Sequence, residues 1–153
     1  MLFRSGLRRT SPCCPTSPQT TSPTTNSQPA IRHAKPSDYG RVIGRVNVWW
    51  GGREMAPMLP NLFFLHFEGT TFVAEGEGEE LIGFLCGFLS QTAGDEAYIH
   101  FVGVSPQHRG EGIGRALYER FFDEVRTHGR TLVRCVTSRS EEHTSELQSH
   151  VRI

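Results

Sequence analysis

The stretch AYIHFVGVSPQHRGEGIGRAL, residues 97–117, organises the sequence around it. Its apolar run, 97–104, is long enough for a buried strand and too short for a typical helix. Ser105-Pro106 ends this run, and a glycine-rich turn follows. A helical pattern then begins, because apolar residues recur at spacings of four on one face: Ile113, Leu117, Phe121 and Val125. The stretch therefore predicts a strand, a tight turn and a helix that ends near His128-Gly129.

The turn contains Gly110, Gly112 and Gly114 and leads directly into the helix. Unpaired backbone N–H groups converge at a helix N-terminus and the helix dipole favours negative charge, so the turn indicates an anion site. The Walker phosphate loop is excluded, because Ile113 follows Gly112 where that loop requires lysine. The dinucleotide fingerprint G-x-G-x-x-G does not fit three glycines spaced evenly by two. An ordinary tight turn without a ligand is the alternative.

A more specific pattern is Gln107-x-x-Gly110-x-Gly112, which follows a strand ending in Val-x-Val-x-Pro. This pattern closely resembles the acetyl-CoA pyrophosphate loop of the GCN5-related N-acetyltransferase (GNAT) superfamily. The element order over about residues 29–138 resembles the fold of the same family. The resemblance implies an α/β (α+β) fold in which helices flank a mixed central sheet.

The expected strands and helices follow from hydrophobic periodicity and from turn residues. Strands are expected at 30–33, 70–75, 81–91, 97–104 and 131–136, and helices from Ser37 or Asp38 to Gly51-Gly52, at 58–67 and from Ile113. Gly83 and Gly87 inside the long strand suggest bulges or close approach of a helix. In the second helix Leu59, Leu62, Phe63 and Phe67 are expected to face inward, although Pro57 and Pro60 would equally suit a loop.

The two ends of the chain are expected to lie outside the fold. Residues 1–28 are rich in Ser, Thr and Pro, a composition that predicts disorder. Residues 139–149 resemble a translated sequencing adapter, so residues 139–153 are interpreted as a non-native tail. The acetyltransferase domain, 29–138, would then be incomplete. It would lack the last helix and the closing strands, and strand 131–136 would keep an unpaired edge.

The resemblance places acetyl-CoA, as co-substrate, where the fourth and fifth strands splay apart. The main chain of Val102–Val104 would pair with the pantetheine arm, and the backbone N–H groups of 109–114 would hold the pyrophosphate. Arg109 and Arg115 would add charge-assisted bonds to phosphates, or would equally suit a solvated surface. The implied cofactor-binding set is Val102, Gly103, Val104, Arg109, Gly110, Glu111, Gly112, Ile113, Gly114 and Arg115.

Two residues of the fourth strand are candidates for the general base that must deprotonate an attacking amine. They are Glu96 and His100, and strict alternation would place both on one face with Tyr98, Val102 and Val104. Histidine changes its charge near neutral pH, which suits a base or a water relay. A core histidine and a rim carboxylate are the alternatives. No residue is assigned to protonate the departing thiolate.

The segment after the first helix, where the family builds its acceptor pocket, contains Trp49, Trp50 and Arg53. Two indoles suit an organic amine through stacking or cation–π contact, and Arg53 would take a substrate carboxylate. Packing of the tryptophans against the core is the equal alternative.

Composition narrows the classes of partner. Sixteen basic and sixteen acidic residues balance. The sequence has no basic patch that would indicate nucleic-acid binding and no apolar run long enough to indicate a membrane span. The four cysteines show no metal spacing, and Cys86 and Cys135 lie in apolar strand patterns as expected for reduced thiols. We therefore expect a cytoplasmic protein without a metal; a homodimer is compatible with the sequence.

These observations predict an N-acetyltransferase that transfers the acetyl group of acetyl-CoA by direct attack of a primary amine of a small molecule or peptide. A module that binds acyl-CoA without turnover is the alternative. A nucleotide-binding phosphate loop is disfavoured, because the lysine and the metal-binding hydroxyl are absent.

Overall fold

A computed structural model of the 153-residue chain describes residues 29–137 and 147–152. Six strands form one sheet in the order β1-β2-β3-β4-β5-β6, and every neighbouring pair is antiparallel except β4 with β5. The strands are β1 Ala30–His33, β2 Thr71–Glu75, β3 Leu81–Leu89, β4 Glu96–Val104, β5 Leu132–Thr137 and β6 Leu147–Arg152. The α-helices are α1 Asp38–Trp49, α2 Leu62–His66 and α3 Ile113–Thr127. This mixed sheet flanked by helices confirms the expected fold class.

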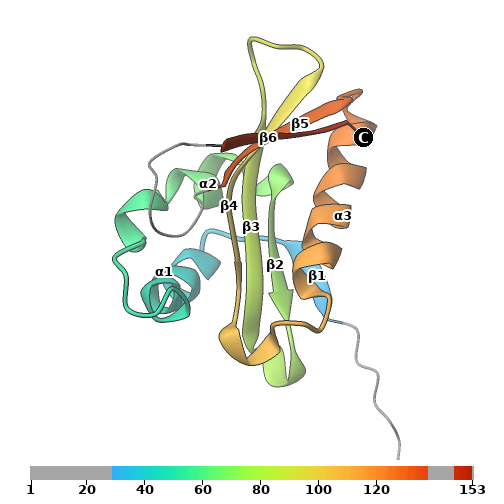
Figure 1. Cartoon of the computed structure of the whole chain (residues 1–153). Helices are drawn as coiled ribbons and strands as arrows, with labels where there is room; N and C mark the ends of the chain where they lie inside the picture. Colours follow the sequence, from blue (N-terminus) through green and yellow to red (C-terminus); the bar gives the residue numbers. More distant parts are fainter. Residues whose placement is uncertain (1–28, 138–146, 153) are drawn as a thin grey trace, which may run out of the picture.

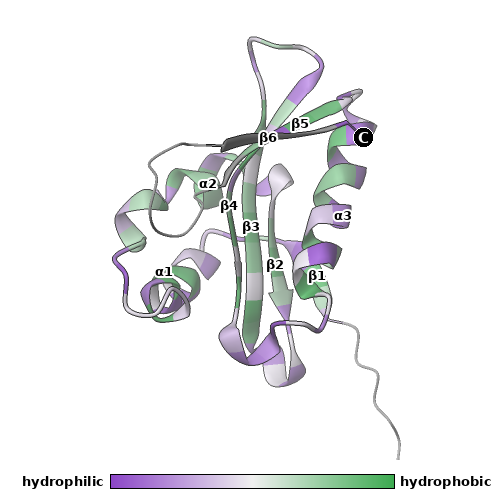
Figure 2. Ribbon diagram, viewed as in Figure 1, coloured by the Kyte–Doolittle hydropathy of each residue, from purple (hydrophilic) through white to green (hydrophobic). Residues whose placement is uncertain are grey.

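Helices cover both faces of the sheet. Figure 1 shows α1 and α2 on one side and α3 on the other, and Figure 2 shows the most apolar strand, β3, between them. Two hydrophobic clusters correspond to these two interfaces. The apolar stripe of α3 is fully buried as predicted, with exposed fractions of at most 2% at Ile113, Leu117, Phe121 and Val125. Burial of these side chains is the main force that holds α3 to the sheet.

The second helix is shorter than predicted. A 3-10 turn at Ala56–Met58 contains Pro57, and α2 itself begins only at Leu62. Proline at position 60 lacks an N–H and cannot continue a helical ladder, which explains the division. Leu62 is 41% exposed, whereas Phe64 is fully buried, so the expected inward face is wrong at these two positions.

The expected free edge of the fifth strand is also wrong. β6 pairs with β5 along its whole length, from Leu132 opposite Arg152 to Thr137 opposite Leu147. The local sequence pattern of β6 did not predict this pairing, because the pairing depends on the position of another strand. The predictions for residues 1–28 and 138–146 lie outside the described residues, and the interpretation of 139–153 as non-native stays a prediction.

None of the helices in the described part of the chain has the length and hydropathy needed to cross a bilayer. In the same part of the chain, no group of three or more His, Cys, Asp or Glu side chains is placed to hold a metal ion.

Candidate active site

A gap between β4 and β5 is the central feature of the site. Their parallel pairing joins Glu96–Ile99 to Leu132–Cys135 and stops there. β4 continues to Val104, so among the described residues Val102–Val104 have no partner on β5. Figure 1 shows β5 and β6 at a steep angle to β4. Backbone N–H and C=O groups on that edge of β4 are therefore available to an extended ligand.

A bulge in β4 lies at the start of this gap. Ile99 is opposite Gly87 on β3, but the next pair is Phe101 with Cys86, so His100 has no partner across the ladder. One extra residue on a strand increases its local twist and re-aims the side chains that follow. The bulge therefore helps to turn β4 away from β5.

The bulge also reverses the alternation of side chains along β4. Ile99 packs in the cluster beneath α3, whereas Phe101 packs in the cluster with α1 and α2. Val102 and Val104 then contact the α3 cluster, while His100 contacts Phe63 of α2. The sequence-based expectation that one face carries Glu96, Tyr98, His100, Val102 and Val104 is therefore wrong.

The glycine turn has the geometry of an anion cradle. Gly110 and Gly112 have φ angles of +84° and +81°, and a Cβ on either would meet no atom within 4 Å. The first backbone hydrogen bond of α3 runs from the Ala116 N–H to the Gly112 carbonyl. The N–H groups of the first helical turn therefore lack intrahelical partners. The residues present fit a pyrophosphate group, which needs backbone donors and room for close approach.

The two loop arginines have different surroundings. Arg109 donates a hydrogen bond from Nη2 to the carbonyl of Trp49 at 2.9 Å, which ties the loop to the end of α1. Arg115 is 83% exposed and pairs with Glu119 one helical turn away. Arg115 thus has the solvated environment that the sequence left open, and Arg109 has a structural bond that the sequence did not indicate.

His100 is anchored on both sides of its ring. Nε2 lies 2.8 Å from the carbonyl oxygen of Met58, and the ring stacks on Phe63 with centroids 4.7 Å apart. A carbonyl only accepts hydrogen bonds, so Nε2 carries a proton, and Nδ1 is the ring nitrogen that can accept one. The bulge and these two contacts direct His100 to the α2 side of the gap.

Glu96 lies at the opposite end of β4, where the strand is still paired with β5. Its carboxylate accepts two bonds from Arg134, at 2.7 and 2.6 Å, in a bidentate ion pair across the two strands. This pair raises the pKa of Arg134. The guanidinium occupies both carboxylate oxygens, so the geometry favours the rim role for Glu96.

The three residues expected to bind the acceptor have different surroundings in the structure. Trp49 is 5% exposed and stacks on Phe84 in the core, so it has the packing role. Trp50 is half-buried and meets Phe101 edge-on at 5.1 Å. Arg53 is exposed beyond Gly51 and Gly52, both of which adopt positive φ. Trp50 is therefore the indole that borders the gap.

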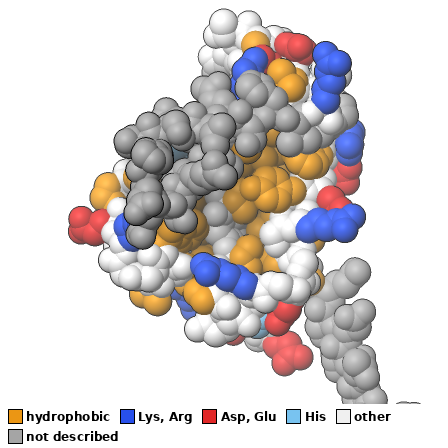
Figure 3. Space-filling view, viewed as in Figure 1, with side chains coloured by type: hydrophobic (Ala, Val, Ile, Leu, Met, Phe, Trp, Pro, Cys, Tyr) orange, Lys and Arg blue, Asp and Glu red, His pale blue; other side chains and the backbone are white. Residues whose placement is uncertain are grey.

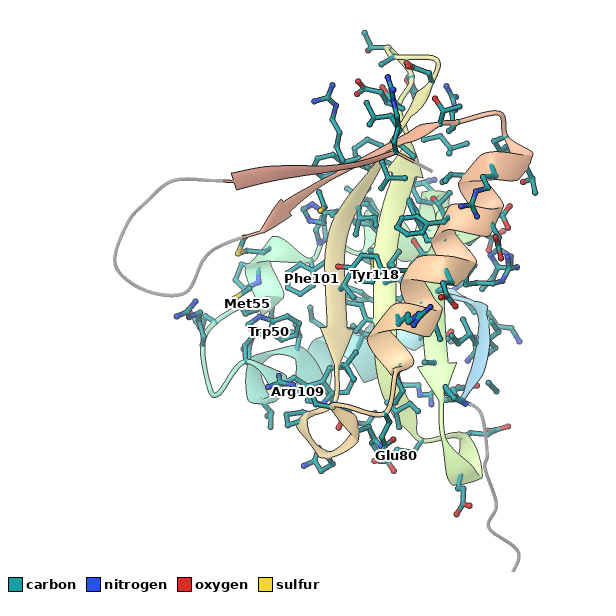
Figure 4. All side chains as sticks on the ribbon, turned by 45° about the vertical axis from the view of Figure 1, so that its right-hand side comes forward. Trp50, Met55, Glu80, Phe101, Arg109 and Tyr118 are labelled. Atoms are coloured by element: carbon teal, nitrogen blue, oxygen red, sulfur yellow. The ribbon has the colours of Figure 1, made fainter. Side chains whose placement is uncertain are left out.

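Further residues of the site were missed by the sequence analysis. Figure 4 shows Trp50, Met55 and Phe101 together on the α1 side of β4, with Arg109 below them and Tyr118 of α3 across the sheet. Tyr118 packs in the α3 cluster, and burial together with the nearby Cys135 raises the pKa of its hydroxyl. It lies one position beyond the buried stripe of α3, so periodicity did not single it out.

Hydrophobic side chains gather on the face between α1 and α3, and cationic side chains border them (Figure 3). An apolar surface with cations at its margin suits a flexible arm that ends in phosphates.

A family comparison agrees with this geometry. Residues 30–145 match the model of the acetyltransferase (GNAT) family, which covers more than half of the chain. The chain belongs to the GNAT family. The expected resemblance, stated above from the glycine turn, is therefore confirmed.

The similarity to individual GNAT proteins is partial or low in sequence identity. L-2,4-diaminobutyric acid acetyltransferase of Nocardia farcinica (strain IFM 10152) is 40% identical over 72 residues, which are 47% of this chain and 37% of that protein. The diaminobutyrate acetyltransferase EctA of Paenibacillus lautus, solved with L-2,4-diaminobutyric acid and coenzyme A, superposes with a TM-score of 0.60 at 22% identity. That superposition covers 72% of this chain and 66% of EctA.

Ard1 of Thermoplasma volcanium superposes with a TM-score of 0.61 at 23% identity and covers 73% of each chain. At these identities the two solved structures establish the GNAT fold alone. The chain spans little more than a third of the curated relative that it matches and just under two thirds of EctA.

Proposed function

We propose that this chain is an acetyl-CoA-dependent N-acetyltransferase whose acceptor is the primary amine of a small molecule. The observation that carries the proposal is the stretch Val102–Val104, which pairs with β3 but has no partner on β5 among the described residues and lies beside the open glycine turn. Together they offer a backbone edge for a pantetheine arm and a cradle for its pyrophosphate. The similarity to a diaminobutyric acid acetyltransferase supports an amino acid amine as the first acceptor to test.

The reaction needs a base on the acceptor side of the gap. Nδ1 of His100 takes a proton from the ammonium form of the acceptor, directly or through water, and the free amine attacks the thioester carbonyl. A backbone N–H of Val102 or Val104 polarises the carbonyl oxygen. The C–N bond forms as the C–S bond breaks, and coenzyme A leaves as a thiolate that takes up the proton which the attacking nitrogen loses when it becomes the amide.

Titration calorimetry with acetyl-CoA tests the binding step. The wild-type chain should bind, and Gly112→Trp should abolish binding, because the indole would occupy the cradle. Gly129→Trp is the matched control: Gly129 also has a positive φ, +69°, and open surroundings, but it follows the far end of α3. No binding by the folded wild-type chain, or equal loss in both variants, would contradict the proposal.

Turnover is tested separately with L-2,4-diaminobutyrate and a panel of small amines, by following release of the free thiol. Thiol release that depends on the amine supports the enzyme. Binding of acetyl-CoA with no turnover on any amine would instead support a binding module.

We also propose a cytoplasmic location. Cys86 is buried and forms no disulfide within the described part of the chain, which suits a reducing compartment. Burial raises the pKa of its thiol and keeps it protonated. Fractionation of cells that express the tagged chain would test the location, and recovery of the chain outside the cytosol would contradict it.

A further inference from the structure

The C-terminal end of α1 closes with a Schellman motif. Gly52 N–H donates to the carbonyl of Asn47, and Gly51 N–H donates to the carbonyl of Val48. Gly51 supplies the left-handed conformation that this motif requires, with φ of +68°, and Gly52 after it also has a positive φ, +87°. The motif leaves the carbonyl of the last helical residue, Trp49, without a partner from its own segment.

Arg109 supplies that missing partner from sixty residues away. Its Nη2 donates to the Trp49 carbonyl, while the last turn of α1 contains no basic residue of its own. Cationic side chains near a helix C-terminus stabilise the last carbonyls and interact favourably with the dipole. The guanidinium of the glycine turn therefore completes the cap of α1.

Trp50, the next residue, forms the wall of the gap on the α1 side. Its indole lies so close to Gly103 that a Cβ there would come 2.8 Å from Trp50 Cη2. The same ring meets Phe101 edge-on. Asn47 holds the other end of the loop, because its Oδ1 accepts bonds from the N–H groups of Met55 and Ala56. The position of Trp50 therefore depends on how the end of α1 is held.

We propose that Arg109 is a positioning residue that links the glycine turn to Trp50, the wall of the gap on the α1 side. Arg109 fixes the Trp49 carbonyl and thereby holds the Trp50 ring over β4. This inference rests on the proposed function, because it treats the glycine turn as the coenzyme A loop. A ligand that orders the turn then also orders the Trp50 wall, and the acceptor binds more tightly after coenzyme A. By linkage, such coupling between two sites is reciprocal.

The two tryptophans of the chain provide a built-in probe. Trp49 is buried in the core, so a soluble quencher such as acrylamide reaches chiefly Trp50. The experiment measures acrylamide quenching with and without coenzyme A in the wild type, Arg109→Met and Arg109→Lys. Arg126→Met is the matched control, because Arg126 is an exposed arginine of α3 that pairs within its own helix, with Asp123.

Coenzyme A should protect Trp50 in the wild type and in Arg126→Met. In Arg109→Met, quenching should rise about twofold and the protection should disappear, as expected for loss of one bond to a charged donor. Arg109→Lys keeps the charge but not the guanidinium fork. It should therefore bind coenzyme A like the wild type but show the raised quenching and the lost protection of Arg109→Met.

Two results would overturn the inference. The first is a roughly tenfold loss of coenzyme A affinity in Arg109→Met that Arg109→Lys restores, with unchanged quenching, since this identifies a phosphate ligand. The second is quenching that is equal in all four proteins. In an active enzyme, Arg109→Met should also raise the KM for the amine about fivefold at saturating acetyl-CoA, and it should leave the affinity for coenzyme A in the absence of amine unchanged.

The fluorescence measurement needs no turnover. Absence of turnover in the wild type would therefore count against the proposed function, whereas unchanged quenching in Arg109→Met would count against the role of Arg109.

Discussion

The ring of Phe121 on α3 lies directly on the backbone of Gly87 on β3. A Cβ added at Gly87 would come 2.5 Å from Cε2 of Phe121 and 2.7 Å from the carbonyl oxygen of Tyr98. The second of these atoms belongs to the backbone of the neighbouring strand and cannot move aside without disturbing the ladder. Gly87 therefore sets how closely α3 approaches the sheet, as the sequence suggested for a glycine inside a strand.

Gly87→Ala should destabilise the fold by about 2 kcal/mol, the typical cost of overpacking a well-filled core. Urea unfolding followed by circular dichroism measures this change. Gly44→Ala is the control: Gly44 is an exposed residue of α1 where an added Cβ would meet no atom within 4 Å, so alanine there should be neutral or stabilise by about 0.5 kcal/mol. Equal stability of wild type and Gly87→Ala would contradict the close packing.

A charge network joins β1, α1 and β2 and should make stability depend on pH. Asp38 is buried and accepts bonds from Arg32, Arg41 and the Lys35 N–H. Burial alone would raise the pKa of Asp38, but the bonds from Arg32 and Lys35 outweigh it and lower the pKa to about 2. A carboxyl whose folded pKa is depressed stabilises the fold above its unfolded pKa and loses that stability as pH falls.

Wild-type stability should therefore fall by about 2 kcal/mol from this group between about pH 4 and pH 2. Asp38→Asn should be less stable at neutral pH and should show a shallower loss over that range. The bonds from Arg32 also lower the pKa of Glu75, so Glu75 contributes part of the pH dependence of the unfolding free energy in both proteins. Unfolding free energies measured at half-unit pH steps test this, and identical slopes would exclude Asp38 as their source.

His100→Gln should lower kcat by about 100-fold, the lower range for loss of a general base. Glutamine retains a donor for the Met58 carbonyl, so the fold should be unaffected. Glu96→Gln should lower kcat much less, because Glu96 pairs with Arg134 away from the gap. A larger loss in Glu96→Gln than in His100→Gln would reverse the assignment.

The neighbouring tryptophans should respond differently to truncation. Trp49→Ala removes a core ring and should cost about 4 kcal/mol of stability. Trp50→Ala removes a half-buried ring at the gap, so it should cost less stability and raise the KM for the amine. Thermal unfolding and steady-state kinetics on both variants separate the two effects. Equal destabilisation with an unchanged KM would show that Trp50 is a packing residue as well.

Local patterns in the sequence were enough to predict several of the helices and strands. The spacing of Ile113, Leu117, Phe121 and Val125 predicted the buried stripe of α3, because a 3.6-residue period records which side of a helix is apolar. The bounds of β1 and the hairpin of β2 and β3 followed in the same way. The glycine turn carried the family assignment, since its chemistry lies in the backbone of a few consecutive residues.

Only the tertiary structure decided the features that join distant segments. The bulge at His100 appears only when β4 is aligned with β3, so alternation along one strand could not predict which side Val102 and Val104 face. The bond from Arg109 to the Trp49 carbonyl spans sixty residues. Register and side-chain contacts of this kind depend on the relative placement of whole elements, and a local period of two or 3.6 residues does not contain that information.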